Sequence, residues 1–294
     1  AIELPPIKGK VEFKNVNFSF FPSQEEEDEE DTYYVLKDIN LTVELGENIA
    51  ILGPTGSGKS AFVKLIPRFY DVSKGEILVD GVNIKDVTFK SLRKQIGYVS
   101  QDRVLFSRSI KDNIAFGNRN ASLEEIKEAA VASDIHQFII NELPDGYETK
   151  VGERGKTVSG GQKQRLAIAR ALALKPRILI LDDSTSAVDV DTEFKIQRHF
   201  AEVFKDCTTF LITQRLSSVR NADRIIVLEA GRIVQIGTHE ELLTQQEGIY
   251  KKLYETGIYS SALSAISLSD INSLYTSIEE LTSNLIYTFS ELNF

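Results

Sequence analysis

A glycine-rich turn between a short apolar segment and a helix-like stretch limits the possible folds of this chain more than any other feature. Residues 53–60, GPTGSGKS, match the pattern G-x4-G-K-S of a phosphate-binding loop. The apolar segment Asn48–Leu52 precedes them and the stretch Ala61–Phe69 follows, which is the strand–loop–helix context that this motif requires. An ordinary glycine-rich turn is the alternative interpretation, and it does not account for that context.

The chemistry of this turn suits a polyphosphate, which needs many close donors in a small space. Glycines let backbone N–H groups approach the phosphates, and the N-terminus of a helix adds partial positive charge. We expect Lys59 to neutralise the β and γ phosphates and the Ser60 hydroxyl to bind Mg²⁺. The predicted phosphate-binding residues are Gly53, Pro54, Thr55, Gly56, Ser57, Gly58, Lys59 and Ser60.

The hydrophobic pattern predicts two kinds of strand, some buried on one face and others buried on both. Apolar and polar residues alternate over residues 11–20 and 34–43, which is typical of strands that are buried on one face. Short apolar runs at 48–52, 177–182 and 208–213 indicate strands that are buried on both faces. Strands that are buried on both faces are the usual components of a parallel sheet.

Helices are predicted where capping residues precede apolar residues at helical spacing. Ser122–Glu125 is a capping box for a helix that ends near Ser133, and Thr238–Glu241 caps the last helix of the globular part. A longer helix is predicted over residues 160–174. Residues 225–236 indicate a hairpin that turns at a Glu-Ala-Gly sequence.

The predicted fold class is α/β: a P-loop NTPase core of mainly parallel sheet, with an antiparallel β subdomain and an inserted helical subdomain. We expect one domain over residues 1–256, with the helical subdomain near 102–158. The acidic run at 25–31 indicates a solvated loop. Apolar residues at helical spacing in 257–294 predict an amphipathic helix that docks on its own domain or on a partner, and a disordered tail is the alternative.

Composition excludes several classes of protein. No apolar run approaches the roughly 18 residues of a membrane span, and a single cysteine excludes an internal disulfide framework. The net charge of −9 comes from the acidic run and the acidic tail, and the remainder is close to neutral, so no nucleic-acid partner is predicted. Because the chain contains no Met, even at position 1, we expect it to be a piece of a longer polypeptide; initiator removal from a Met-poor protein is the alternative.

Three reactive side chains are expected to have no functional role. Cys207 precedes a buried strand, so we predict that it packs as a small apolar residue. His136 and His239 are expected on the surface of helices.

Two further segments carry candidate functional groups. The strand at 177–182 ends in Asp182, where open α/β sheets bind ligands, and this carboxylate can hold a metal ion through water. Asp183 follows on the opposite face. The segment Ser159, Gly160, Gly161 and Gln162 begins the helix at 160–174, and a hydroxyl and two glycines at a helix N-terminus suit a second anion. A routine strand end and a routine helix start are the alternatives.

These motifs follow one another in a characteristic order, and over about residues 8–256 the sequence resembles the nucleotide-binding domain of ATP-binding cassette (ABC) transporters. Residues 149–155 resemble the loop that is typical of exporters rather than importers. The segments that carry the resemblance are the loop 53–60, Gln101 in YVSQ, the signature 158–162, the strand ending at Asp182, the segment 186–189 and the switch segment 213–216.

The resemblance implies an ATPase that works as a pair. Two such domains bind head to tail, so that ATP and Mg²⁺ on the loop of one copy are covered by the signature of the other. Gln101 would sense the metal and the attacking water, so that Ser60, Gln101 and Asp182 are the predicted metal-site residues. Gln101 would also link the domain to the transmembrane domains of an exporter, which places the chain at the cytoplasmic face of a membrane.

The resemblance also implies an aromatic residue that stacks on adenine. Phe20 occupies the position where the family usually has Tyr, and a π-face suffices for stacking. Phe21, Tyr33 and Tyr34 are close enough in sequence to replace it. A core residue of the first strand is the alternative interpretation of Phe20.

Two positions depart from the family pattern and weaken the predicted hydrolytic site. Asp183 stands where the family has Glu, and Gln214 stands at the switch where it has His. Asp is about 1.5 Å shorter than Glu, and a 1 Å misplacement can cost roughly 10²-fold in rate. Gln cannot carry positive charge or move a proton. We therefore predict that Asp183, Gln214 and Gln101 form a catalytic set that hydrolyses ATP poorly.

The signature, in contrast, stays close to the family pattern, with Val158 in place of the usual Leu. We therefore expect one subunit of a heterodimeric exporter, whose signature completes a competent site on a non-identical second nucleotide-binding domain. Two alternatives remain open. One is an ATP-gated regulatory or clamp module without significant hydrolysis, and the other is a soluble ABC protein of DNA repair or translation.

Overall fold

The computed structural model of the chain describes residues 1–21, 33–102, 104–152, 158–182, 192, 196, 206–213, 216–245 and 247–256. The chain divides into two compact units, residues 1–250 and 251–294. In the second unit the described residues 251–256 are helical. The predicted acidic loop and the predicted tail after residue 257 lie outside the described residues, and the domain boundary that we expect at 256 stays a prediction.

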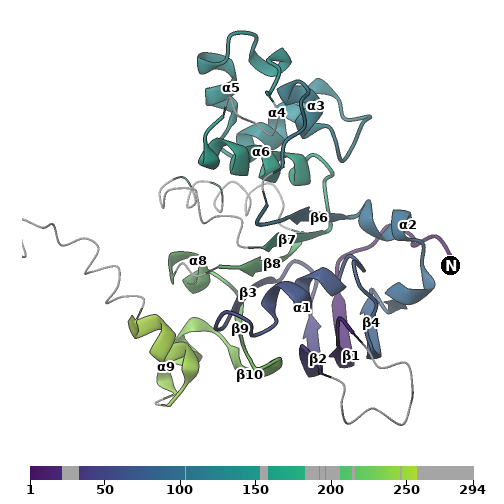
Figure 1. Cartoon of the computed structure of the whole chain (residues 1–294), viewed down its shortest axis with the longest axis vertical. Helices are drawn as coiled ribbons and strands as arrows, with labels where there is room; N and C mark the ends of the chain where they lie inside the picture. Colours follow the sequence, from purple (N-terminus) through teal and green to yellow (C-terminus); the bar gives the residue numbers. More distant parts are fainter. Residues whose placement is uncertain are drawn as a thin grey trace, which may run out of the picture. The chain divides into compact units, whose positions relative to one another are not determined.

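Six strands form the mainly parallel sheet of the first unit, in the order β10–β9–β3–β8–β7–β6 (Figure 1). All neighbours from β9 to β6 are parallel, and only β10 is antiparallel, because it forms the predicted hairpin with β9. Strands β3, β7 and β8 are buried along nearly their whole length, as their apolar runs indicate. The strands are β3 (Asn48–Leu52), β6 (Ile96–Val99), β7 (Ile178–Asp182), β8 (Thr208–Ile212), β9 (Arg224–Glu229) and β10 (Arg232–Gly237).

A second sheet is antiparallel and has the order β2–β1–β4–β5. Buried and exposed positions alternate along β1 and β2 apart from short irregularities, which is the predicted pattern for strands with one solvated face. The strands are β1 (Val11–Phe18), β2 (Leu36–Val43), β4 (Lys74–Val79) and β5 (Val82–Asn83).

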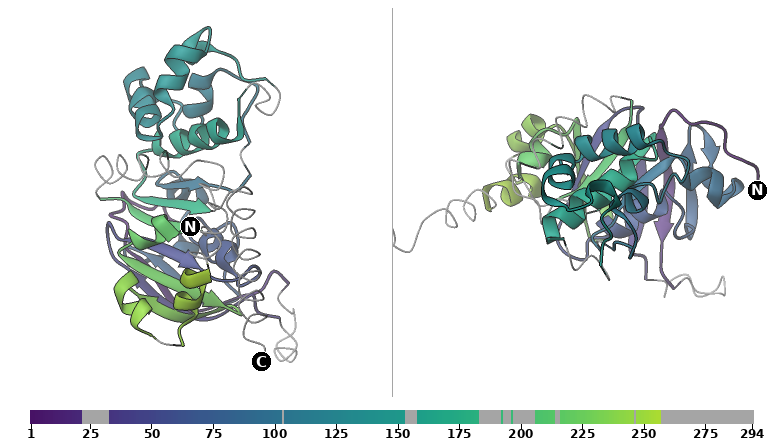
Figure 2. Two further views of the ribbon diagram at one scale, coloured as in Figure 1. Left: turned by 90° about the vertical axis from the view of Figure 1, so that its left-hand side faces the viewer. Right: turned by 90° about the horizontal axis from the view of Figure 1, so that it is seen from above.

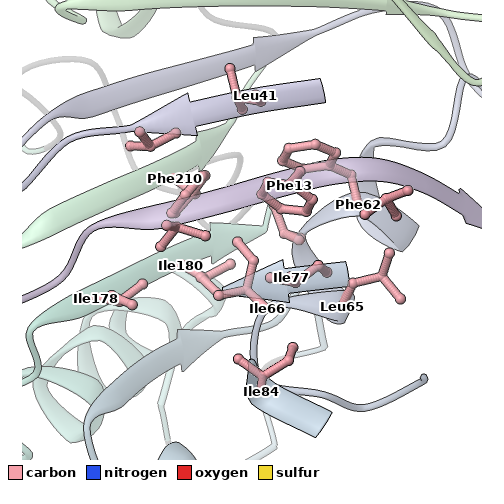
Figure 3. Packing of buried hydrophobic residues seen from close by; sticks show 14 of the residues in the cluster. Phe13, Leu41, Phe62, Leu65, Ile66, Ile77, Ile84, Ile178, Ile180 and Phe210 are labelled. Carbon is pink, nitrogen blue, oxygen red and sulfur yellow. The ribbon is translucent and has the colours of Figure 1, made fainter. Parts of the chain in front are cut away.

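The larger hydrophobic core joins the two sheets through the helix α1 (Lys59–Leu65) (Figure 3). Phe13 on β1 stacks on Phe62 of α1, with ring centroids 4.5 Å apart. Ile180 of β7 and Phe210 of β8 belong to the same cluster and are fully buried. This core therefore fixes α1, and the loop before it, against the parallel sheet.

A second core lies under the helices of the region 102–172. The helices α3 and α4 pack against α6, which also contacts β6. These helices gather beside β6 and β7 in Figure 1, and Figure 2 shows the same grouping from two other directions. Their bounds are α3 (Ile110–Ile114), α4 (Leu123–Ala132), α5 (His136–Glu142), the 3₁₀ helix η3 (Gly146–Glu148) and α6 (Gly160–Leu172).

The α/β fold class with an antiparallel sheet and helices is confirmed. The two predicted capping boxes begin α4 and the last helix of the first unit, α9, and a third capping box, at Ser159, begins α6. No helix among the described residues has both the length and the apolar character to cross a membrane. The remaining helices are η2 (Ile84–Asp86), α2 (Phe89–Arg93), α8 (Leu216–Arg220) and α9 (His239–Thr244).

The expected surface position of His239 is wrong. Its side chain is buried, and its Nδ1 lies 2.6 Å from the hydroxyl of Tyr250, which is itself buried. His136 makes the same kind of contact, with Nδ1 2.7 Å from the Tyr147 hydroxyl. Both histidines thus have structural partners. Cys207 is buried as predicted, and that burial raises the pKa of its thiol to about 12.

Candidate nucleotide-binding site

The phosphate-binding loop follows β3 and leads directly into α1, as the motif requires. Gly53 has φ +145°, and a Cβ there would lie 2.0 Å from the carbonyl oxygen of Leu228 on β9, so only glycine fits. Gly58 is the left-handed N-cap of α1, where a Cβ would lie 2.8 Å from Leu36 Cδ2. The two glycines therefore let the loop press against the neighbouring strands while it turns.

Lys59 closes the loop on itself. Its Nζ donates to the carbonyl oxygens of Gly53, at 2.7 Å, and Pro54, at 2.8 Å. Thr55 and Gly56 are exposed at the tip of the loop, and Ser57 is buried beneath it. The positive charge of Lys59 is thus held beside the backbone of the loop and close to its exposed tip.

The predicted metal-site residues Ser60 and Asp182 lie in direct contact. Ser60 Oγ donates to Asp182 Oδ1 at 3.0 Å. The other carboxylate oxygen, Oδ2, accepts a hydrogen bond from the Tyr98 hydroxyl at 2.9 Å. Burial, and then the charge of Asp182, raises the pKa of Tyr98, so that its hydroxyl stays protonated and acts as a donor.

The register of the parallel sheet explains why residues distant in sequence meet here. Asp182 at the end of β7 is paired with Ile212 of β8, and Ile212 is paired with Ile51 of β3. The carboxyl ends of these strands therefore share one edge of the sheet, which is the usual ligand edge of such folds. Gln101 follows β6 on that edge as an exposed residue, because Val99 is paired with Leu181. No contact between Gln101 and Asp182 is seen, so its metal-site role stays a prediction.

Asp183 and Gln214, the two predicted catalytic residues that depart from the family pattern, lie outside the described residues. Both directly follow a described segment on the same edge, β7 in one case and Thr213 after β8 in the other. Among the described residues there is no cluster of three or more His, Cys, Asp or Glu that suits a metal ion. A hard cation at this site would therefore rely on the Ser60–Asp182 pair and on oxygens of a bound phosphate.

The predicted signature residues cap α6. Ser159 Oγ accepts from Gln162 N at 3.3 Å, and Gln162 Oε1 accepts from Ser159 N at 2.7 Å, which completes a capping box. Ser159 and Gly160 are exposed, Gly161 is half-buried, and the first turn of the helix carries no acidic residue. This helix start is therefore open to a negatively charged partner.

Phe20 lies beyond the end of β1 and is 46% exposed, so it is not a core strand residue. Its ring meets Tyr70 edge-on, with centroids 5.2 Å apart, and both rings contact Phe18. Tyr70 belongs to the stretch after α1 and has no motif of its own, so the sequence gives no signal for its place beside Phe20. Phe21 is also exposed, at 90%, so its ring is accessible as well. Which of these aromatic residues stacks on adenine stays a prediction.

Arg170 connects the segment after Gln101 to the helix that carries the signature. Its guanidinium donates to Val104 O, Asn113 O and Asn113 Oδ1, each at 2.9 Å. It also stacks on the rings of Phe106 and Phe116, which stack on each other. Burial lowers the pKa of Arg170, but an arginine stays charged, so these carbonyl and ring contacts replace its hydration.

We expect Arg170→Ala to lower the free energy of unfolding by about 2–3 kcal/mol, because it removes three hydrogen bonds to a charged donor and two ring contacts. Urea unfolding followed by circular dichroism measures this change. Arg119→Ala removes an exposed arginine from the same region and is the matched control. Equal stability of the two variants would contradict the structural role of Arg170.

Comparison with known proteins identifies the family. Residues 36–186, just over half of the chain, match the model of the ABC transporter family. The chain belongs to that family. It is an ABC nucleotide-binding domain, and this confirms the family resemblance predicted from the order of the motifs.

Among similar proteins, two carry export in their names and one is named as a flippase. The chain is 49% identical to YgaD of Bacillus subtilis, which carries the name of a multidrug export ATP-binding/permease protein, over 86% of this chain and 42% of the relative. It is 47% identical to an ATP-dependent lipid A-core flippase of Syntrophus aciditrophicus, over 87% and 40%. A solved structure of a bacterial Atm1-family ABC exporter with ATP bound has a TM-score of 0.79 and 41% identity, over 87% of this chain and 43% of the other. This ABC domain thus spans about two fifths of the length of these relatives.

Proposed function

We propose that the chain binds Mg-ATP and drives substrate export as the nucleotide-binding domain of an ABC exporter. The observation that carries this proposal is the meeting of the Ser60 hydroxyl and the Asp182 carboxylate beside a phosphate-binding loop closed by Lys59. Hydroxyl and carboxylate oxygens are the ligands that Mg²⁺ prefers, so the residues present fit the metal. When bound, Mg²⁺ would offset the charge of the β and γ phosphates.

The residues of the chain divide the work of binding. The backbone amides of the loop and the Lys59 ammonium would hold the phosphates, and Ser60 and Asp182 would hold the metal, Asp182 through water. The aromatic pair Phe20 and Tyr70 offers exposed ring surface for adenine. Gln101, at the same sheet edge, would order the attacking water.

Transmembrane domains are the proposed partners on the membrane side. The relatives named as ATP-binding/permease proteins are more than twice as long as the matched segment, and this chain has no membrane-crossing helix among its described residues. As a domain of an exporter it would lie at the cytoplasmic face of a membrane, where its ATP cycle would move a permease segment.

A second nucleotide-binding domain is the other proposed partner. The phosphate-binding loop leads into α1, whose residues belong to the core of the two sheets, whereas the signature leads into α6 in the helical region. No hydrogen bond joins the two motifs among the residues that the structure describes. In a head-to-tail pair, the open start of α6 in one copy faces the phosphates bound to the other copy. The phosphate-binding loop and the signature then contact the same nucleotide.

Nucleotide-dependent pairing is expected when the 294-residue chain is mixed with Mg-ATP. Sedimentation velocity should show the monomer mass without nucleotide and about twice that mass with it, because slow hydrolysis at this site keeps the pair together. A mass that ATP does not change, in a chain that binds ATP, would contradict pairing between two copies of this chain.

One variant separates pairing from nucleotide binding. Ser159→Asp keeps a residue that caps helices well but places a negative charge where the phosphates of the second copy would lie. We expect it to abolish pairing and to leave ATP binding to the loop unchanged. Ser122→Asp, the same exchange at the capping box of α4, is the matched control and should pair normally.

Weak hydrolysis is the second part of the proposal. Asp183 is one carbon shorter than the Glu of the family pattern, and Gln214 replaces His. The intact signature would then serve a competent site on a non-identical subunit. The same two residues also favour an ATP-gated clamp without useful hydrolysis, and the rate of hydrolysis with and without a competent second domain separates the two functions.

A further inference from the structure

Asp182 is held at both of its carboxylate oxygens, and only one of the two donors belongs to the phosphate-binding loop. Ser60 Oγ donates to Oδ1 at 3.0 Å, and the Tyr98 hydroxyl donates to Oδ2 at 2.9 Å. The carboxylate is buried, with 5% exposure. A buried carboxylate with a donor on each oxygen cannot rotate without the loss of a hydrogen bond.

Tyr98 is itself fixed by the fold. It belongs to β6, where its backbone is paired with Ile180 of β7, two residues before Asp182. Its ring meets Phe69 edge-on, with centroids 5.1 Å apart, and packs against the larger hydrophobic core. The hydroxyl therefore reaches Asp182 from a rigid neighbouring strand rather than from a mobile loop.

We propose that Tyr98 is a positioning residue for the metal site: by holding Oδ2 of Asp182, it aims the carboxylate so that Oδ1 and the Ser60 hydroxyl face the bound cation. This role rests on the proposed Mg-ATP function and deepens it. Tyr98 need not touch ATP or the metal. Partners that orient a metal-binding carboxylate in this way typically contribute 10–100-fold to metal affinity.

The role predicts a loss that depends on the metal. In Tyr98→Phe, Oδ2 becomes a buried acceptor without a donor, so Asp182 turns toward another partner or recruits water. We expect the Mg²⁺ concentration that gives half of the metal-dependent gain in ATP affinity to rise roughly tenfold. ATP affinity in EDTA should stay the same, because Lys59 and the loop amides are unaltered.

The experiment is calorimetric titration of ATP into the 294-residue chain over a series of Mg²⁺ concentrations and in EDTA. Tyr147→Phe is the matched control, because it also removes one tyrosine hydroxyl that makes a 2.7 Å hydrogen bond, to His136, away from the sheet edge. Circular dichroism confirms that both variants are folded.

The outcomes distinguish this inference from the function on which it rests. A higher Mg²⁺ requirement in Tyr98→Phe, without a change in Tyr147→Phe, supports the positioning role. Unchanged Mg²⁺ dependence, or an equal loss of affinity with Mg²⁺ and in EDTA, overturns it while the ATP-binding function stands. An unaltered chain that binds ATP in neither condition overturns the proposed function, and the positioning role with it.

Discussion

Lys59→Ala should lower the affinity of the chain for ATP by on the order of 100-fold. The Lys59 ammonium is held beside the loop by the carbonyl oxygens of Gly53 and Pro54. A hydrogen bond to a charged group contributes roughly 1.5–3 kcal/mol, and each 1.4 kcal/mol is about tenfold in affinity. Loss of the ammonium leaves the triphosphate with backbone amides alone. Calorimetric titration of ATP measures the change.

Lys64→Ala is the matched control for this experiment, because it removes the same ammonium from the last turn of the same helix. It should bind ATP like the unaltered chain. Since Lys59 also closes the loop, thermal unfolding of both variants must show that the fold is kept. ATP affinity that is unchanged in a folded Lys59→Ala protein would rule out the proposed role of the loop.

Much of the fold follows from local patterns in the sequence. Asn48–Leu52 is a strand with the predicted bounds, because a short and mostly apolar run before a glycine turn has few other stable arrangements. The capping boxes at Ser122 and Thr238 start helices where expected, since the two hydrogen bonds of each box are local. The hairpin of β9 and β10 follows from its turn residues.

The contacts of the site were harder to predict, because they join separate strands. Asp182 was expected at a strand end, but its hydrogen bond to Tyr98 depends on β6 lying next to β7, and no local pattern fixes strand order. His239 was misplaced for another reason: its burial depends on the packing of Tyr250, which follows α9 in the chain, and the pattern within α9 does not show that contact. The contacts of Arg170 could not be predicted either, because no sequence motif marks this residue.

Restoration of the family residues should raise ATP hydrolysis. We expect Asp183→Glu with Gln214→His to increase the turnover of the chain by on the order of 10²-fold over a low starting rate. The longer carboxylate would reach the attacking water, and the imidazole would contact the γ-phosphate and carry charge when protonated. Steady-state phosphate release measures turnover, and ATP affinity should change little because the loop is unaltered.

The two substitutions should act together rather than add. A carboxylate that reaches the water does little if the γ-phosphate is not held, so each single variant should gain less than the pair. The control is Asp145→Glu with Gln137→His, which repeats both exchanges at exposed positions of the helical region and should leave turnover low.

The starting rate of hydrolysis decides between the exporter subunit and the ATP-gated clamp. Brisk turnover by the unaltered chain would show that Asp183 and Gln214 do not weaken the site, and the degenerate-site proposal would fail. Slow turnover that rises when a competent second nucleotide-binding domain is added supports a signature that completes the partner's site. Turnover that stays near zero in that mixture, with ATP still bound, favours the clamp. The signature at Ser159 would then help to hold a nucleotide that neither domain hydrolyses.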